Sequence, residues 1–154
     1  MVSRFAASKD QETVIRAMPY IDPEATLRFV GDGENLAHCK HLAEELGVAD
    51  RVQFLGTRID VAELIAESYI GIQSSKWEGF GLSAVEIMAC GKPIIGSNVE
   101  GLKQVIEGAG ELFDVGDYNE LACKANNLIS DDKVYSERAN AWRTGMIAGT
   151  DAGK

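Results

Sequence analysis

The sequence has no long apolar run. No segment approaches the roughly twenty consecutive apolar residues that a membrane-spanning helix needs. A signal-peptide pattern at the start, internal repeats and low-complexity tracts are also lacking. We therefore expect a cytoplasmic protein with no segment inserted directly in a membrane.

Cysteine is scarce, with only Cys39, Cys90 and Cys123 in the chain. Their spacing fits neither a metal site nor a redox motif, and an odd number argues against a disulfide framework. His38 and His41 flank Cys39 on a predicted helix, but no second group of ligands accompanies them. We expect reduced thiols, a solvated helix face and no metal site.

Positive charge is in deficit, because 15 Lys and Arg residues stand against 24 Asp and Glu residues, for a net charge of -9. This balance argues against nucleic acid and anionic membranes as partners. With 45% apolar content, 154 residues can bury one full core but not two. We expect a single domain over residues 1–142, followed by a glycine-rich flexible tail at 143–154.

Apolar segments rich in β-branched residues alternate with helical patterns along the chain. The expected strands lie at 1–5 (with the start of a loop), 25–30, 51–56, 70–73, 93–96 and 111–113. The expected helices lie at 10–18, 36–46, 60–68, 82–90, 118–130 and 133–142. This alternation predicts an α/β fold: a doubly wound, mainly parallel sheet. In such sheets ligands bind beyond the carboxyl ends of the strands.

The most informative stretch is a glycine turn followed by a helix. At residues 77–93 it reads Trp-Glu-Gly-Phe-Gly-Leu-Ser-Ala-Val-Glu-Ile-Met-Ala-Cys-Gly-Lys-Pro, directly after an expected strand. A helix beginning near Gly81 points its first unpaired N–H groups at the mouth of the turn, and its dipole favours negative charge. We predict a phosphate there, and a left-handed helix end at Gly91.

Two carboxylates frame this turn, Glu78 and Glu86, with seven residues between them. A carboxylate facing a phosphate would repel it, so both are interpreted as acceptors for neutral hydroxyl groups. A nucleotide sugar supplies such hydroxyls on its ribose and on its transferred sugar. The alternative is that both are ordinary solvated charges on a βα turn.

The whole pattern closely resembles a family signature. Glu78-Gly79-Phe80-Gly81, Glu86 and the block 90–95 (Cys-Gly-Lys-Pro-Ile-Ile) are similar to the E-x7-E motif of the retaining GT-B glycosyltransferases, family 4 type (glycosyl transferases group 1). The resemblance covers nearly the whole chain, but only the C-terminal, donor-binding half of those two-domain enzymes. It implies a Rossmann-like half of a GT-B fold. It also implies a missing N-terminal acceptor-binding domain, either in the same full-length chain or as a separate subunit.

The resemblance also implies roles for individual residues. Catalytic roles fall on Glu78, which would contact the sugar hydroxyls, and on Arg4 and Lys9, which would contact the donor diphosphate. Paired cations suit a diphosphate because charge-assisted hydrogen bonds are strong. Glu86 would hold the ribose hydroxyls. The other expected donor contacts are Gly79, Phe80, Gly81, Leu82, Ser83 and, near the base, Thr57.

Two further features follow from the resemblance. Asp10 stands after Lys9, where the family usually has glycine, and we expect it to cap the following helix. Residues 97–102 resemble a loop that faces the donor sugar. No metal or other cofactor is needed in this scheme, because positive groups and a helix N-terminus stabilise the charge.

The implied reaction transfers a sugar from a UDP- or GDP-linked donor to an acceptor hydroxyl with retention at the anomeric carbon, in polysaccharide biosynthesis. The isolated half should bind nucleotide but catalyse little, because water is not excluded and no acceptor is positioned. The alternatives are a non-catalytic nucleotide-sugar-binding module, one subunit of a split transferase, or an epimerase or phosphorylase on the same half-fold. Peripheral association with an inner membrane would run through the missing half.

Overall fold

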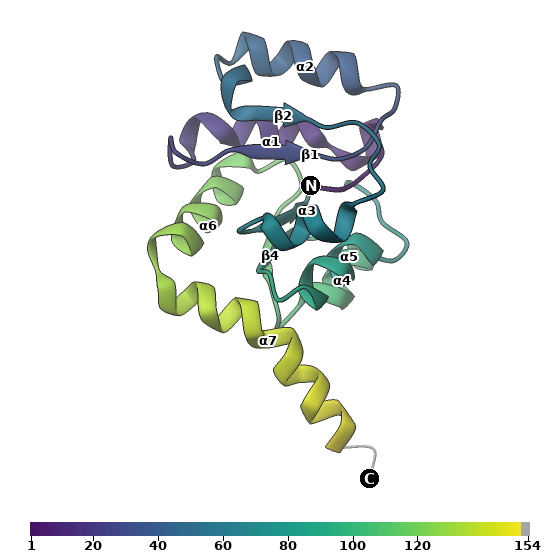
Figure 1. The fold of residues 1–154 in the computed structure, drawn as a ribbon, viewed down its shortest axis with the longest axis vertical. Helices are drawn as coiled ribbons and strands as arrows, with labels where there is room; N and C mark the ends of the chain where they lie inside the picture. Colours follow the sequence, from purple (N-terminus) through teal and green to yellow (C-terminus); the bar gives the residue numbers. More distant parts are fainter. Residues whose placement is uncertain (152–154) are drawn as a thin grey trace.

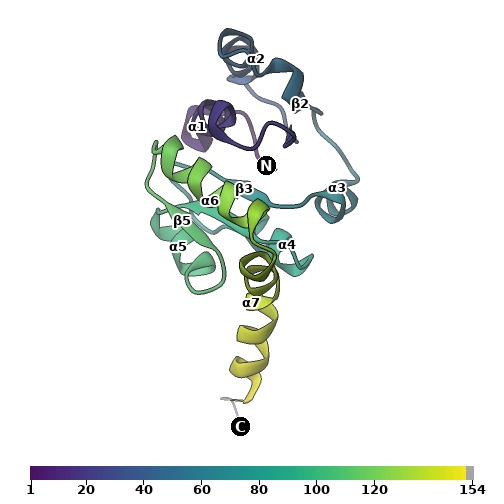
Figure 2. The same ribbon diagram turned by 90° about the vertical axis from the view of Figure 1, so that its left-hand side faces the viewer.

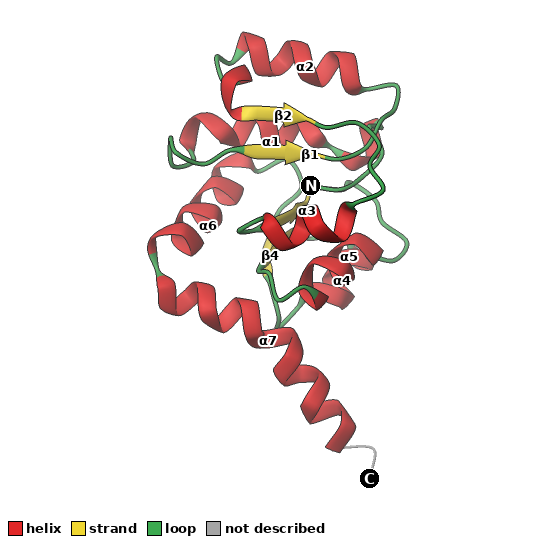
Figure 3. Ribbon diagram, viewed as in Figure 1, coloured by secondary structure: helices red, strands yellow, loops and turns green. Residues whose placement is uncertain are grey.

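Parallel strands alternate with helices in the computed structural model, which describes the backbone of residues 1–151 and the side chains up to residue 144 (Figures 1 and 3). The two strands β1 (Leu27–Phe29) and β2 (Val52–Phe54) pair with each other. A second sheet has the order β3-β4-β5. Its strands are β3 (Gly71–Gln73), β4 (Ile94–Ser97) and β5 (Glu111–Phe113). All pairs are parallel, as predicted.

The N-terminal segment forms a single β-bridge instead of the expected first strand, because only Val2 pairs with Val30. The main-chain N–H of Ser3 donates to the carbonyl of Val30 at 3.0 Å, and that of Val30 donates to the carbonyl of Met1 at 2.9 Å. On the other side, Gln73 Nε2 of β3 donates to the carbonyl of Val2 at 3.0 Å. Through these hydrogen bonds the segment connects the two sheets.

Seven α-helices surround the sheets in the described part of the chain. They are α1 (Gln11–Ala17), α2 (Leu36–Glu45), α3 (Val61–Glu67), α4 (Leu82–Ala89), α5 (Glu100–Ile106), α6 (Tyr118–Ser130) and α7 (Asp132–Asp151). Short 3-10 turns lie at Ala7–Lys9, Met18–Tyr20 and Ala49–Arg51. Among the described residues, no helix is both long and apolar enough to cross a membrane.

The strand β4 is buried on both faces, which makes the domain doubly wound. Ile94 packs into a core with α4 and α5, and its neighbour Ile95 packs into the larger core with α1, α2 and α6. Successive side chains of a strand point to opposite faces, so the two cores lie on opposite sides of the sheet. Figure 2 shows α6 on one side of the three-stranded sheet and α4 with α5 on the other. The expected α/β fold class is confirmed.

Two elements differ from expectation. Residues 97–102 are not a loop throughout, because α5 begins at Glu100. The last helix does not end at Trp142 but continues to Asp151, while residues 152–154 of the expected tail lie outside the described residues. Gly145 and Gly149 each weaken a helix by about 1 kcal/mol relative to alanine, but do not by themselves end one.

Candidate functional site

Two loops meet beyond the carboxyl end of β3, one running from residue 3 to 10 and the other from 74 to 81. The buried hydroxyl of Ser74 joins them by donating to the carbonyl oxygens of Lys9 and Asp10, both at 2.8 Å. Because these loops follow neighbouring segments of a parallel arrangement, their position at the same edge is the one the topology predicts.

Asp10 adopts a left-handed conformation with φ of 53°, the only positive φ at a non-glycine residue in the described part of the chain. This backbone region favours glycine, which explains why the family usually has glycine at this position. Asp10 is the N-cap residue of α1, as expected, and its carboxylate accepts the hydroxyl of Thr13 in the first turn at 2.7 Å. Burial raises the pKa of Asp10, and the Thr13 hydrogen bond opposes that rise.

A cavity of about 270 Å³ opens between the first loop and the N-terminus of α4. Its lining comprises Val2, Ser3, Arg4, Lys9, Gln73, Glu78, Phe80, Gly81, Leu82, Ser83, Ala84 and Leu102. Seven of the ten expected site residues therefore come together here, although Arg4 and Ser83 are far apart in the chain. The other three, Gly79, Glu86 and Thr57, are not in this lining.

Two of the three predicted catalytic residues, Lys9 and Glu78, form an ion pair, with Nζ and Oε2 2.9 Å apart. Their side chains are only 24% and 17% exposed, so solvent screens the pair less than it would at the surface. Ser75 Oγ donates to the same glutamate oxygen at 3.0 Å. Ser75 is held in turn by the Ser97 hydroxyl, which donates to its carbonyl at 2.5 Å. Glu78 is thus fixed by two donors.

Arg4 stands at the exposed side of the cavity. Its Nη2 lies 3.0 Å from Glu34 Oε2, and both side chains are mostly exposed. The main-chain N–H of Glu34 and then the Arg4 guanidinium lower the pKa of Glu34. The buried Gln11 donates to the Arg4 carbonyl at 2.8 Å, so the backbone is anchored while the guanidinium lies in solvent.

The N-terminus of α4 forms one wall of the cavity. Gly81 is its N-cap and no side chain caps the helix. The N–H of Leu82 donates to the carbonyl of Phe80 at 2.8 Å, so it is not available to a ligand as expected. In the described chain, no main-chain acceptor is found for the N–H groups of Ser83 and Ala84, and both residues line the cavity. They and the helix dipole favour an anion here.

The remaining expected contacts lie around the cavity. Glu86 is exposed on α4, four residues after Leu82, and side chains at this spacing lie on the same helix face. Gly79 is exposed in the turn, and Thr57 is exposed in the loop after β2. Glu86 therefore lies on the same face of α4 as Leu82, and neither Glu86 nor Thr57 belongs to the cavity lining.

Three supporting residues were not predicted from the sequence. Gln73 and Ser75 are polar but buried, and the sequence signals only that polar residues follow an apolar strand. Gly101 of α5 lies so close to the turn that an added Cβ would be 1.9 Å from the carbonyl oxygen of Glu78. This close approach of α5 to the turn, which a sequence does not show, leaves no room for a side chain at position 101.

Metal ligands are not clustered in the described part of the chain, where no three His, Cys, Asp or Glu side chains gather in a suitable arrangement. The site's cationic groups and helix terminus can stabilise negative charge without a metal. The expectation that no metal is needed stays a prediction.

Comparison with known proteins gives a consistent picture. The family model described as Glycosyl transferases group 1 matches residues 1–145. The N-acetyl-alpha-D-glucosaminyl L-malate synthase of Bacillus anthracis is 38% identical over 138 residues, which are 87% of this chain and 36% of that protein. The structure of Anabaena HepE with UDP has a TM-score of 0.88 and 29% identity, covering 99% of this chain and 48% of HepE. The HepE complex with UDP-glucose has a TM-score of 0.87 and 32% identity, covering 91% and 42%.

The chain thus spans less than half the length of these relatives. The structural similarity to HepE extends over almost the whole of this chain. It confirms the Rossmann-like half of a GT-B fold that was expected from the sequence. With the family model matching nearly the whole sequence, the chain belongs to the glycosyl transferases group 1 family.

Proposed function

We propose that this chain is the donor-binding half of a retaining glycosyltransferase, which moves a sugar from a UDP-linked donor to an acceptor hydroxyl. The observation that carries the proposal is the cavity in which Arg4, Lys9 and the N-terminus of α4 converge beside Glu78. HepE, which shares this fold, was crystallised with UDP and with UDP-glucose, and this favours uridine over guanosine as the base.

The diphosphate would lie against the N-terminus of α4. There the N–H groups of Ser83 and Ala84 would donate to one phosphate, and Lys9 and Arg4 would approach from the opposite loop. When the bond between the anomeric carbon and the diphosphate oxygen breaks, negative charge accumulates on that oxygen. Groups already aimed at this position stabilise the leaving diphosphate without reorganising.

Glu78 would have a different partner in the donor complex. In the ligand-free site its Oε2 is bound by Lys9 and Ser75. A diphosphate competes with the carboxylate for Lys9, because it carries more charge and presents several acceptors. Glu78 would keep the Ser75 hydrogen bond and accept a hydroxyl of the sugar. Glu86, further along the same face of α4 as Leu82, would accept the ribose hydroxyls.

The acceptor and the closing of the site would come from the other half of the enzyme, in the same full-length chain or as a separate subunit. Three large apolar side chains at the turn support this assignment: Trp77, Phe80 and Leu82 are 71%, 60% and 64% exposed. Apolar groups gathered on one loop beside a cavity are typical of a surface that another domain covers.

Calorimetric titration with UDP, GDP and ADP tests the proposal, with the wild type, Lys9→Gln and Lys133→Gln compared. Lys133 is exposed on α7, so its variant controls for loss of one positive charge. We expect UDP to bind best, and Lys9→Gln to weaken it about 10- to 100-fold, since a hydrogen bond to a charged group contributes about 1.5–3 kcal/mol.

Two results would contradict the proposal. One is equal UDP affinity of the wild type and Lys9→Gln, and the other is no nucleotide binding by a chain shown to be folded. Preference for GDP would reject only the uridine assignment. Retention is tested separately on the complete enzyme, by NMR assignment of the anomer in the product of the first turnover.

A further inference from the structure

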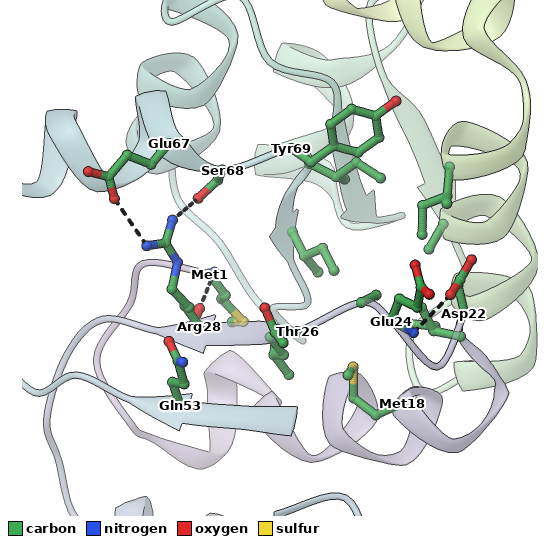
Figure 4. Close-up of a pocket in the computed structure, with 17 residues that line it drawn as sticks. Met1, Met18, Asp22, Glu24, Thr26, Arg28, Gln53, Glu67, Ser68 and Tyr69 are labelled. Atoms are coloured by element: carbon green, nitrogen blue, oxygen red, sulfur yellow. Dashed lines mark hydrogen bonds and ion pairs between the residues drawn. The ribbon is translucent and has the colours of Figure 1, made fainter. Parts of the chain in front are cut away.

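A second and larger cavity, of about 660 Å³, lies at the other end of the strands (Figure 4). The segments leading into β1 and β3 and the helix α6 contribute to its lining. Its basic side chain, Arg28, is paired with Glu67, and the α-amino group of Met1 donates to the Arg28 carbonyl at 2.8 Å. The lining also includes the carboxylates of Asp22 and Glu24. Because carboxylates repel an anion, a diphosphate suits the smaller cavity and not this one.

Ser3 lines the smaller cavity beside Arg4 and Lys9, and the function proposed above gives it no role. The backbone of Ser3 is held on two sides. Its N–H donates to the carbonyl of Val30 at 3.0 Å. Its carbonyl oxygen is so close to Gly31 that a Cβ added to that glycine would be 1.9 Å away. The serine hydroxyl therefore extends from a segment whose backbone is fixed.

A buried amide binds the Ser3 hydroxyl. Gln11, the first residue of α1, is 0% exposed. Its Nε2 donates to Ser3 Oγ at 3.0 Å and to the carbonyl of Arg4 at 2.8 Å. Its Oε1 is also buried and has no hydrogen-bond partner in the described chain. The amide is thus held by its nitrogen alone, and both contacts are to the loop that carries the cations of the site.

The Arg4 carbonyl determines which end of the Gln11 amide faces this loop. A carbonyl oxygen only accepts hydrogen bonds, so the amide group 2.8 Å from it must be the NH₂ end. Turning the amide over would place Oε1 against that oxygen, with no proton between two acceptors. Because the same nitrogen reaches Ser3 Oγ, the serine is the acceptor in their hydrogen bond.

The proton of the Ser3 hydroxyl is therefore available to another acceptor. A serine hydroxyl has one proton and two lone pairs, and Gln11 occupies one of the lone pairs. In the described chain, Ser3 Oγ makes no second hydrogen bond. The carboxylate of the lining, Glu78, is bound by Lys9 and Ser75 instead. A ligand that presents only acceptors, such as a phosphate group, matches a cavity whose free groups are donors.

We propose that the Ser3 hydroxyl donates to the diphosphate of the nucleotide, and that Gln11 is the positioning residue that directs the serine proton into the cavity. Phosphate oxygens are strong acceptors, and a hydrogen bond to a charged group is stronger than one between neutral groups. This inference rests on the proposed function, which supplies the diphosphate. It also explains why a glutamine, and not an apolar residue, is buried at the start of α1.

Calorimetric titration of UDP into the wild type, Ser3→Ala and Ser136→Ala tests the direct contact. Ser136 is exposed on α7, so its variant controls for the loss of a serine hydroxyl elsewhere. We expect Ser3→Ala to weaken UDP binding about tenfold, near the lower end for a hydrogen bond to a charged group. Ser136→Ala should leave it unchanged. Uridine, titrated by NMR chemical shifts, should bind the wild type and Ser3→Ala alike, because it has no phosphate.

Gln11→Met tests the positioning role, because methionine fills similar space and has no amide. We expect it to weaken UDP binding in the wild-type background and to have less effect in the Ser3→Ala background, where the proton that Gln11 directs is gone. Gln11→Met also releases the Arg4 carbonyl, so the difference between the two backgrounds is the part that acts through Ser3. Circular dichroism confirms folding, and if Gln11→Met does not fold, the Ser3→Ala titrations alone decide the contact.

The outcomes separate this inference from the function on which it rests. Equal UDP affinity of the wild type and Ser3→Ala, where Lys9→Gln still weakens binding, would overturn the inference and leave the proposed function in place. Equal losses of UDP and uridine affinity in Ser3→Ala would overturn it too, because the hydroxyl would then contact the nucleoside. Equal effects of Gln11→Met in both backgrounds would remove its positioning role. If the folded wild type binds no UDP, the proposed function and this inference fail together.

Discussion

At the scale of single residues, the site depends on contacts between distant parts of the chain. Lys9 and Glu78 are 69 positions apart, yet they share an ion pair that Ser75 supports. Asp10 holds a left-handed backbone directly after Lys9, and the Ser74 hydroxyl fixes both carbonyl groups. The lysine is therefore positioned by its backbone as well as by its charge, which would suit the contact with a diphosphate proposed for it.

Gly101 is expected to be intolerant of any side chain. In Gly101→Ala the new Cβ would be 1.9 Å from the Glu78 carbonyl oxygen, so the turn or α5 must move. Overpacking of this kind costs about 1–3 kcal/mol. It outweighs the gain of about 1 kcal/mol in helix propensity that alanine brings. Urea unfolding should show the loss.

Gly79→Ala is the matched control, because the nearest atom to its added Cβ is a Trp77 side-chain carbon at 3.8 Å. It should change stability much less than Gly101→Ala. If the two variants unfold at the same urea concentration, the close approach of α5 to the turn does not constrain the fold.

The α-amino group of Met1 should make stability depend on pH between 5 and 8. Its pKa is lowered from 8.0 to about 5 in the folded protein, so in this window the unfolded chain binds a proton that the folded chain does not. Stability is therefore complete above pH 8 and falls as the pH falls toward 5. At about 1.4 kcal/mol per pKa unit, the loss amounts to a few kcal/mol.

Urea unfolding of the 154-residue chain at several pH values measures this effect, with the Nα-acetylated chain as the control. Acetylation keeps an N–H for Arg28 and removes the titration, so the acetylated chain should lose less stability over the same range. Parallel pH profiles of the two chains would show that the amino group is not buried in solution.

At the scale of elements, alternation of strand and helix patterns was enough to locate β1 to β5 and most of the helices. It was also enough to place Arg4, Lys9 and Glu78 at one edge, because parallel strands end there together. The whole of α5 was missed, since residues 97–102 were interpreted as a loop and Gly101 reads as a loop residue. Glycine at position 101 is explained by tertiary packing, because the turn at Glu78 leaves no room for a side chain there. Burial of Gln73 and Ser75 depends likewise on packing that no local pattern encodes.

The N-terminus of α6 carries half of a capping box, the motif in which the N-cap side chain and a glutamate three residues later each accept the other's main-chain N–H. Asp117 Oδ1 accepts the Glu120 N–H at 2.9 Å, as expected for an N-cap. The Glu120 carboxylate, however, accepts the N–H of Asp114 at 3.0 Å, so it secures the chain entering the helix and not the cap itself. The cap stabilises the first turn of α6, and α6 in turn covers one face of the sheet and supplies apolar side chains to the main core.

Asp117→Ala should therefore destabilise the fold by about 1 kcal/mol, the usual cost of losing a side-chain cap. Asp114→Ala removes an exposed carboxylate from the same turn and keeps the main-chain N–H that Glu120 binds, so it is the control. Thermal unfolding of both variants makes the comparison. Equal midpoints would show that the Asp117 hydrogen bond does not hold α6 in place.

At the scale of the whole molecule, the two cavities lie at opposite ends of the strands. The smaller one gathers positive groups in a chain whose net charge is -9, so the proposed nucleotide binding would depend on local fields and not on the overall one. The larger one is lined by the segments leading into β1 and β3 and by α6.

The isolated chain should accordingly separate binding from catalysis. With UDP-glucose as the probe, we expect binding by calorimetry but no release of UDP above the buffer background. Phe80 and Leu82 are 60% and 64% exposed at the cavity, so water enters and no acceptor is held near the anomeric carbon. Sustained UDP release that Lys9→Gln abolishes and Lys133→Gln does not would mean that this half carries out the chemistry alone. The covering domain would then serve to select the acceptor, and not to complete the site.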